Sequence, residues 1–333
     1  MNPATRSSLG SLCLAGALIL SGSAVGSAAE DQLTLVRSGL PHDALFDVQF
    51  QNGRGLAVGA HGAILESVDD GKSWSPLDSL GELSLLAVAL EPERSIIVGQ
   101  QGAIFVAAGT EPYRRVDSGS TERLLSVALD SASGRAVAVG GFGTVLISND
   151  AGETWEAQLL DWESLNEEGL EAHLYDVEIT PRGEIFIIGE FGLVLSSTDG
   201  GNTWQTRAQG DESLFALHLG ADGIGYAVGQ DGVMLRSQDG GQSWLRLDTG
   251  SRGNMLDVWA SPEEEVVVVG IRTLLRSSDG GDSWTTVSDR SIERAWYQAL
   301  APGIVSQQGD EVTLHEQRIY AVGQTGKIVT INH

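Results

Sequence analysis

The chain has 333 residues, of which 45 are acidic and 20 are lysine or arginine, so its formal net charge is −25. So acidic a protein is not expected to bind nucleic acid or an anionic membrane surface, because both carry the same sign of charge. Cys13 is the only cysteine, which excludes an internal disulfide framework, and about 300 residues can bury a sizeable core without one.

The first 29 residues have the pattern of a secretory signal peptide. Arg6 is their only charge, an apolar stretch follows at residues 12–20, and small residues lead up to Ala28 and Ala29. The apolar stretch is shorter than the roughly 20 residues that a helix needs to cross a bilayer. We therefore predict a signal peptide at 1–29 and a single exported domain at 30–333.

A repeat begins immediately after this segment. An apolar run ending in Val-Gly or Ile-Gly occurs seven times, and its glycines are successively 40, 41, 49, 40, 41 and 53 residues apart. These glycines are Gly59, Gly99, Gly140, Gly189, Gly229, Gly270 and Gly323. A fixed period of this length is typical of repeat folds. The two long gaps indicate insertions, one at residues 161–172 and one within residues 290–316.

Each repeat resembles four short β-strands. In the fifth repeat, apolar runs at residues 214–219, 225–229, 233–237 and 244–247 are separated by glycine and aspartate. Four strands in about 40 residues make one blade of a β-propeller. The last repeat lacks its fourth strand, and residues 32–37 precede the first complete repeat. We predict an all-β, seven-bladed propeller whose last blade is completed by the N-terminal strand.

A second motif, the Asp-box Ser-x-Asp-x-Gly-x-Ser/Thr-Trp, occurs at residues 67–74, 148–155, 197–204, 237–244 and 277–284. Asp-boxes occur in sialidase-like enzymes and in propellers that only bind. Five copies spread around a ring cannot converge on one substrate, so we interpret them as stabilising turns between the third and fourth strands. The structural residues are Asp69, Trp74, Asp150, Trp155, Asp199, Trp204, Asp239, Trp244, Asp279 and Trp284. The second blade lacks the motif and places Tyr113 near the tryptophan position.

The turns after each Val-Gly share one face of a propeller with the connections between blades, and function usually resides on such loops. The candidate partner-binding residues on this face are His61, Gln101, Arg123, Phe142, Phe191, Gln230, Asp231, Arg252, Arg272 and Arg294. Arginine and aromatic residues dominate protein-binding hot spots, so this face suits a protein or peptide partner. Trp162, in the acidic insertion, could contact a partner or pack back on its blade.

The combined unit Val-Gly-x-x-Gly-x-Ile/Val-x-x-Ser-x-Asp-Gly-Gly-x-Ser/Thr-Trp resembles the repeat of the photosystem II stability/assembly factor family, most clearly at residues 188–204 and 228–244. The resemblance covers nearly the whole domain. It implies a seven-bladed propeller without catalytic activity that binds a membrane protein during assembly through a basic patch. Arg123, Arg252, Arg272 and Arg294 are the nearest match to that patch.

We therefore predict a non-enzymatic, monomeric assembly or stability factor for a membrane protein complex, in the periplasm or in a thylakoid lumen. We predict no metal and no cofactor, because the sequence has no Cys/His cluster, phosphate loop or Gly-x-Ser-x-Gly motif. The alternative is an Asp-box glycoside hydrolase. A sialidase would use an arginine cluster with Tyr175 or Tyr297 near the axis, and a glucanase would use two acids.

Overall fold

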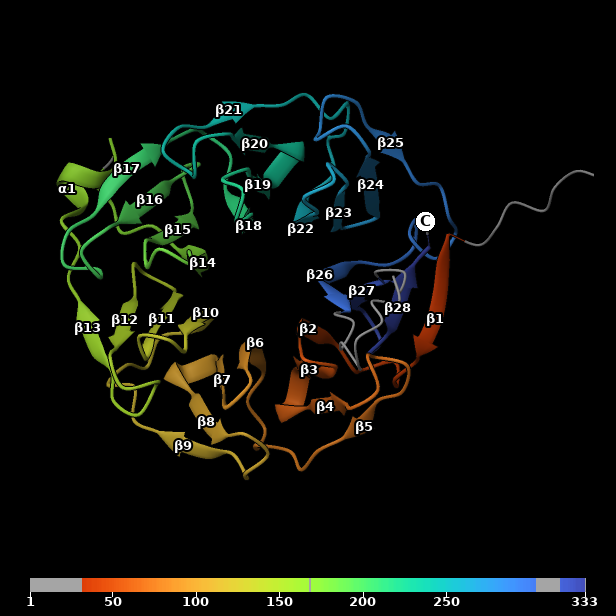
Figure 1. Ribbon diagram of the computed structural model, residues 1–333, viewed down its shortest axis with the longest axis horizontal. Helices are drawn as coiled ribbons and strands as arrows, with labels where there is room; N and C mark the ends of the chain where they lie inside the picture. The colour runs from red at the N-terminus through yellow and green to blue at the C-terminus, as the bar shows by residue number, and fades with distance from the viewer. Residues whose placement is uncertain (1–31, 168, 304–317, 333) are drawn as a thin grey trace, which may run out of the picture. The chain divides into compact units, whose positions relative to one another are not determined.

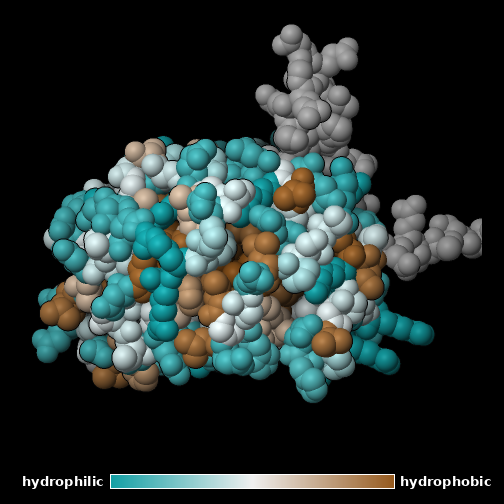
Figure 2. All heavy atoms as spheres, turned by 90° about the horizontal axis from the view of Figure 1, so that it is seen from below, coloured by the Kyte–Doolittle hydropathy of each residue, from teal (hydrophilic) through white to brown (hydrophobic). Residues whose placement is uncertain are grey.

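The computed structural model describes residues 32–167, 169–303 and 318–332, so the predicted signal peptide and residues 304–316 of the region that holds the second insertion lie outside it. The described strands form seven antiparallel, four-stranded sheets arranged in a ring, with the first strand of each sheet at the centre (Figure 1). The predicted seven-bladed propeller is confirmed. Seen edge-on, hydrophilic residues cover most of the surface and hydrophobic ones gather in the middle of this side (Figure 2).

From the centre outwards, sheet 1 contains β2 (Leu45–Gln51), β3 (Arg54–Gly59), β4 (Ile64–Ser67) and β5 (Ser75–Pro76), and sheet 2 contains β6 (Leu85–Glu91), β7 (Arg94–Gly99), β8 (Ile104–Ala108) and β9 (Arg114–Val116). Sheet 3 contains β10 (Leu124–Asp130), β11 (Arg135–Gly140), β12 (Val145–Ser148) and β13 (Glu156–Gln158), and sheet 4 contains β14 (Leu174–Ile179), β15 (Ile185–Gly189), β16 (Val194–Ser197) and β17 (Gln205–Ala208). Sheet 5 contains β18 (Leu214–Leu219), β19 (Gly225–Gly229), β20 (Met234–Ser237) and β21 (Leu245–Arg246), and sheet 6 contains β22 (Met255–Ala260), β23 (Val266–Gly270), β24 (Thr273–Ser277) and β25 (Thr285–Thr286). Sheet 7 contains β26 (Tyr297–Gly303), β27 (Arg318–Gly323), β28 (Ile328–Ile331) and β1 (Leu33–Arg37). The helices are α1 (Trp162–Leu165) and the one-turn 3-10 helices η1 (Ala60–Gly62), η2 (Gln100–Gly102) and η3 (Gln230–Gly232).

The ring is closed by pairing the two ends of the chain. β1 runs antiparallel to β28, with Leu33 opposite Ile331 and Leu35 opposite Val329. In Figure 1 the red N-terminal strand accordingly lies beside the blue C-terminal one. This pairing gives sheet 7 its fourth strand, so β28 is not left as an exposed sheet edge that could pair with another chain. The predicted closing role of the N-terminal strand is confirmed.

The core lies between neighbouring sheets. One cluster joins Leu56 and Ile64 of sheet 1 to Val88 and Phe105 of sheet 2, and similar clusters occur around the ring. Both faces of the second and third strands are buried in this way, which explains their continuous apolar runs.

The repeated Val-Gly glycine is required by a close backbone contact. A Cβ atom on Gly229 would lie 1.9 Å from the carbonyl oxygen of Ser213, and one on Gly59 would lie 2.0 Å from that of Ala44. The backbone of these glycines is extended, so the requirement is space at the entry of the first strand and not a positive φ.

Candidate binding face and central channel

The Asp-box aspartates hold their own turns, as predicted. In the fifth sheet Asp239 Oδ1 accepts a hydrogen bond from the N–H of Ser243 at 2.9 Å, and Asp239 Oδ2 accepts one from the Ser243 hydroxyl at 2.6 Å. The indole N–H of Trp244 donates to the carbonyl of Gly241 at 2.9 Å. The other four boxes repeat these bonds.

These hydrogen bonds favour the ionised carboxyl. The pKa is lowered to about 2 for Asp150, Asp199, Asp239 and Asp279, and it is also lowered for Asp69. The largest cause is the hydrogen bond from the hydroxyl of the Ser or Thr four residues later, and the backbone N–H of that residue contributes as well. Carboxyls this acidic cannot serve as general acids near neutral pH.

Sheet 2, which lacks an Asp-box, has Tyr113 near the tryptophan position. This side chain packs against the core cluster between sheets 1 and 2, and its hydroxyl lies 2.8 Å from the Ser95 hydroxyl. The substitution therefore preserves the packing function of the motif.

The turns between second and third strands share a face with the connections between sheets, which we call the turn face. Hydrogen bonds from the N–H of Leu80 to Gly62 O, 3.3 Å, and from the N–H of Gly102 to Glu122 O, 2.7 Å, tie turns to connections. One non-glycine residue in each of the seven turns has a positive φ between 51° and 60°. These residues are His61, Gln101, Phe142, Phe191, Asp231, Arg272 and Thr325. Left-handed backbone at non-glycine residues is uncommon and often accompanies function.

Three of the four predicted arginines form one group, which we call the arginine sector: Arg252, Arg272 and Arg294. The N–H of Arg272 donates to the carbonyl of Ala295 at 3.0 Å, which brings the turn of sheet 6 against the loop that carries Arg294. A Cβ on Gly253 would lie 2.1 Å from Thr273 Oγ1, so the loop that carries Arg252 borders the same turn.

Arg123 lies away from the arginine sector. It precedes β10 and borders the turn of sheet 3, three sheets around the ring from sheet 6. The four arginines therefore share a face but do not form one patch. All four are exposed, and none forms an ion pair with another described residue. Unpaired cations are notable in a protein with more than twice as many acidic as basic side chains.

The other predicted face residues divide into exposed and packed ones. His61, Gln101 and Gln230 are exposed, and Phe142 is 63% exposed with its ring 4.7 Å from that of His173. Phe191 instead packs against the core between sheets 3 and 4, so it is less available than the sequence suggested.

Asp231 and Arg252 border a hollow of about 690 Å³ on sheet 5. Arg246 also lines this hollow and forms an ion pair with Glu212, with N–O distances of 2.9 and 3.1 Å. The hollow therefore combines the cation of Arg252 with the carboxyls of Asp231 and Asp248.

The acidic insertion packs back on the ring. Trp162 begins α1 and lies over Gly143, since a Cβ there would be 2.6 Å from Trp162 Cζ2. The carbonyl of Leu165 accepts hydrogen bonds from Thr206 at 2.6 Å and Gln209 at 2.9 Å. Of the two interpretations of Trp162, the structure supports packing against the sheet.

Sequence reasoning missed a feature of the first strands. In each of the seven sheets the pairing of first and second strands skips one residue: Leu45 lies opposite Gly59, but Asp47 lies opposite Val58. Such a β-bulge breaks the alternation of side chains, so Phe46 and Asp47 both line the central channel. The signal was present as a recurring Leu-x-Asp/Ala/Ser-Val/Leu, for example at residues 45–48 and 174–177.

The bulged residues surround the end of the channel that opens on the turn face, and we call them the collar. Its apolar members are Phe46, Leu86, Leu125, Tyr175, Phe215 and Leu256. Gln298 occupies the seventh position. The Tyr175 and Phe215 rings meet edge-on at 5.2 Å, and Phe46 stacks on Trp296 at 6.3 Å.

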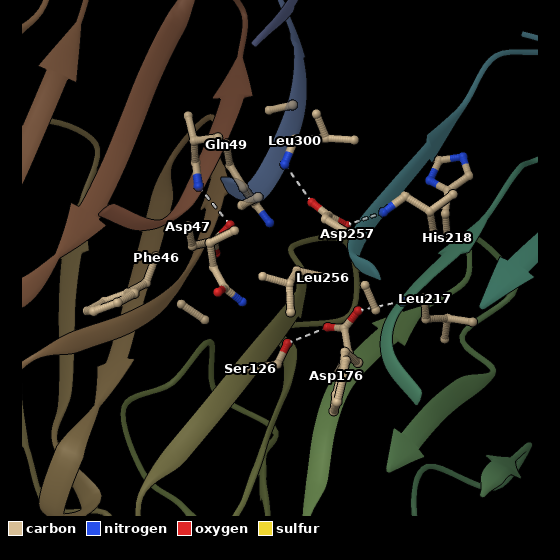
Figure 3. A pocket seen from close by; sticks show the side chains of 18 of the residues that line it. Phe46, Asp47, Gln49, Ser126, Asp176, Leu217, His218, Leu256, Asp257 and Leu300 are labelled. Carbon is tan, nitrogen blue, oxygen red and sulfur yellow. Dashed lines mark hydrogen bonds between the residues drawn. The ribbon is translucent and has the colours of Figure 1, made fainter. Parts of the chain in front are cut away.

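Below the collar, three aspartates join neighbouring sheets (Figure 3). Asp47 accepts hydrogen bonds from the N–H of Val48 at 2.7 Å and that of Val88, on sheet 2, at 2.8 Å. Asp176 is bonded to Ser126, Val177 and Leu217, which links sheets 3, 4 and 5. Asp257 links sheets 6 and 7 through the N–H of Leu300 at 2.5 Å.

Burial changes the acidity of these carboxyls. It raises the pKa of Asp47 to about 7 and that of Asp176 to about 6, and it raises the pKa of Glu178 and Asp257 well above their usual range. The described channel lining contains one histidine, His218, and no lysine or arginine that could offset this effect. Perturbed carboxyls often mark active sites, but these accept hydrogen bonds from backbone amides that hold the ring together.

The two tyrosines considered for a sialidase lie in different environments. Tyr175 belongs to the collar, where burial and then the charge of Glu190 raise its pKa. Tyr297 is only 1% exposed and lies in the core between sheets 6 and 7, so its expected place near the axis is wrong.

Within the ranges that the structure describes, no group of three His, Cys, Asp or Glu side chains is arranged to hold a metal ion. The same residues include no helix long and apolar enough to cross a membrane.

Comparison with known proteins agrees with this architecture. Residues 156–253 match the family model described as photosynthesis system II assembly factor YCF48, which confirms the resemblance predicted from the repeat. No curated protein sequence matches the chain.

Solved structures share the fold at low sequence identity. "YCF48 bound to D1 peptide" is 18% identical, covers 92% of this chain and 99% of that one, and has a TM-score of 0.68. YCF48 from Cyanidioschyzon merolae is also 18% identical, covers 90% and 98%, and has a TM-score of 0.71. The GH74 xyloglucanase from Xanthomonas campestris is 16% identical, covers 90% of this chain but 53% of that one, and has a TM-score of 0.66.

Proposed function

We propose that the protein is an exported, non-catalytic propeller that binds a segment of a membrane protein and acts as an assembly or stability factor for its complex. The site of export is the periplasm, or the thylakoid lumen of a photosynthetic source. The matched family model and the structure described as YCF48 bound to D1 peptide support a protein partner of this kind.

The observation that carries the proposal is the set of arginines on the turn face that form no ion pair with any residue the structure describes. An arginine that has no carboxylate of its own remains available to an acidic or carbonyl-rich partner. Neighbouring carboxylates neutralise other arginines of this chain, such as Arg54 and Arg94. The aromatic members of the collar open on the same face, and arginine with aromatic residues is the usual composition of a binding hot spot.

Affinity capture of the full-length protein on native membranes tests the proposal. We expect recovery of one membrane protein, and at least a tenfold loss of it when Arg252→Glu is combined with Arg272→Glu. Arg115→Glu with Arg182→Glu is the matched control, because both arginines are exposed outside the turn face and the change in charge is the same. Equal recovery by the two double variants would contradict the assignment of the face.

An Asp-box glycoside hydrolase is the second candidate. Tyr175 beside Glu190 is the phenol–carboxylate pair that a sialidase needs, and the channel carboxyls include groups with raised pKa values that could serve as acids. The likeness to a GH74 xyloglucanase is a likeness of fold. Purified protein assayed on sialosides and β-glucans separates the two functions: turnover that Tyr175→Phe or Asp176→Asn abolishes would establish the hydrolase.

A further inference from the structure

The collar leaves apolar surface exposed at the centre of the ring, beyond the ring contacts of Tyr175 with Phe215 and of Phe46 with Trp296. A bulge leaves its extra residue outside the strand pairing, and six of the seven positions place an apolar side chain there, half-buried, at the rim of a channel of about 360 Å³. This volume lies near the lower end of the roughly 300–1,000 Å³ typical of ligand pockets. The space admits a single large side chain.

The collar is continuous with the arginine sector through Trp296. The ring of Trp296 stacks on Phe46 with an angle of 4° between the planes, and its backbone forms a bridge to Ile271, which precedes Arg272. Ile271 is itself 46% exposed. An apolar path therefore leads from the channel rim to three cations without ion-pair partners among the described residues.

The carboxyls below the collar do not call for a cationic occupant. Both oxygens of Asp47 accept backbone N–H groups, and Asp257 likewise accepts those of Val258 and Leu300. Their hydrogen-bonding capacity is engaged within the protein, whereas the collar side chains are only half-buried and the three arginines form no ion pair within the described residues. The groups available to a partner are therefore the apolar side chains of the collar, at the centre of the ring, and the cations of the arginine sector beside it.

We propose that the collar anchors one apolar side chain of the partner, aromatic or leucine-like, with acidic residues flanking it in the partner's sequence. This inference rests on the proposed function and specifies which segment of a partner the turn face takes. The apolar side chain enters the collar, and the flanking carboxylates reach the arginine sector.

Three peptides test the anchor directly: acetyl-Glu-Phe-Glu-amide, and the same peptide with serine or with lysine at the centre. Titrated into full-length protein with labelled leucine methyls, the Phe peptide is expected to perturb Leu86, Leu125 and Leu256 and to bind at least tenfold more tightly than the Ser peptide. Equal affinity of the two, tighter binding of the Lys peptide, or shifts confined to other leucines would overturn the proposal.

The variant Leu125→Gln with Leu256→Gln should remove the preference for phenylalanine. Glutamine is compatible with the site, since Gln298 occupies the seventh collar position. Leu35→Gln with Leu245→Gln, at exposed positions of outer strands, is the matched control and should retain the preference. Unfolding curves of both variants verify the fold.

Capture from membranes distinguishes the two proposals. If the arginine variant loses the partner and the collar variant keeps it, the anchor is wrong and the binding function stands. If wild type captures no membrane protein, the proposed function fails, and the peptide titration still decides the anchor.

Discussion

Replacing Asp47 with asparagine should change how stability depends on pH. The pKa of Asp47 is raised from 3.8 to about 7 in the folded protein, chiefly by burial. Between these values the folded state binds more protons than the unfolded chain, so this carboxyl's contribution to stability is full at low pH and is lost as pH rises towards 7. The shift corresponds to at most about 4 kcal/mol. Because the channel is open to water and its other carboxyls titrate too, we expect about 1–2 kcal/mol.

The asparagine side chain of the Asp47→Asn variant cannot ionise, but its NH₂ group cannot accept the hydrogen bond of Val48 or Val88. The loss of one acceptor costs about 1 kcal/mol at every pH. Urea unfolding at pH 5 and pH 8 should therefore show Asp47→Asn less stable than wild type at pH 5, and as stable or more stable at pH 8. Asp239→Asn is the control. The pKa of Asp239 is about 2, so this variant should lose the same stability relative to wild type at both pH values. A difference between wild type and Asp47→Asn that does not change with pH would refute the assignment of a raised pKa.

Three further outcomes follow from the repeated motifs. Gly229→Ala should lower the free energy of unfolding by more than about 3 kcal/mol or prevent folding, because the new Cβ would lie 1.9 Å from a carbonyl oxygen. Gly240→Ala is the control, since Gly240 has open space around it and a φ of +73°, and it should lower that free energy by only about 1 kcal/mol. Thermal unfolding measures both. Asp239→Ala should cost about 1–2 kcal/mol and alter the fluorescence of Trp244, whose turn it holds. Acid titration should leave the fold intact to about pH 4 and destabilise it towards pH 2, because the Asp-box carboxyls, Asp150 among them, have lowered pKa values and their contribution is lost only as pH falls through about 2.

Much of the fold could be predicted because the repeat encodes it locally. The Val-Gly glycine marks a fixed close contact and occurs once in each of the seven sheets, so counting it counts sheets. The Asp-box marks a fixed turn and occurs in five of them. Sheet 2 could be placed without a box, since Tyr113 stands where the tryptophan would be. The closing strand was predictable because the last repeat lacks a fourth strand and the N-terminal strand precedes the first complete repeat.

The site was less predictable, because it depends on contacts between repeats. Arg123 and Arg272 both lie in loops of the turn face. Only the folded ring shows that these loops belong to sheets 3 and 6, which are three sheets apart. Phe191 and Phe142 occupy equivalent turns, yet one packs on the core and the other is exposed, a difference set by neighbouring side chains. The collar depends on a bulge, which no single strand reveals, although the seven aligned strands do.

Two sets of aspartates in this protein use the same chemistry in opposite environments. Asp239 and its equivalents accept amide and hydroxyl hydrogen bonds at the solvent-exposed surface, which lowers their pKa and fixes a turn. Asp47 and Asp257 accept amide hydrogen bonds within the channel, where burial raises their pKa, and they tie one sheet to the next. In both sets the oxygens that a hydrolase would need for its substrate already accept hydrogen bonds from groups within the protein. Within the described residues, the arginines of the turn face form no ion pair and the apolar collar beside them is only half-buried, and that combination favours binding over catalysis.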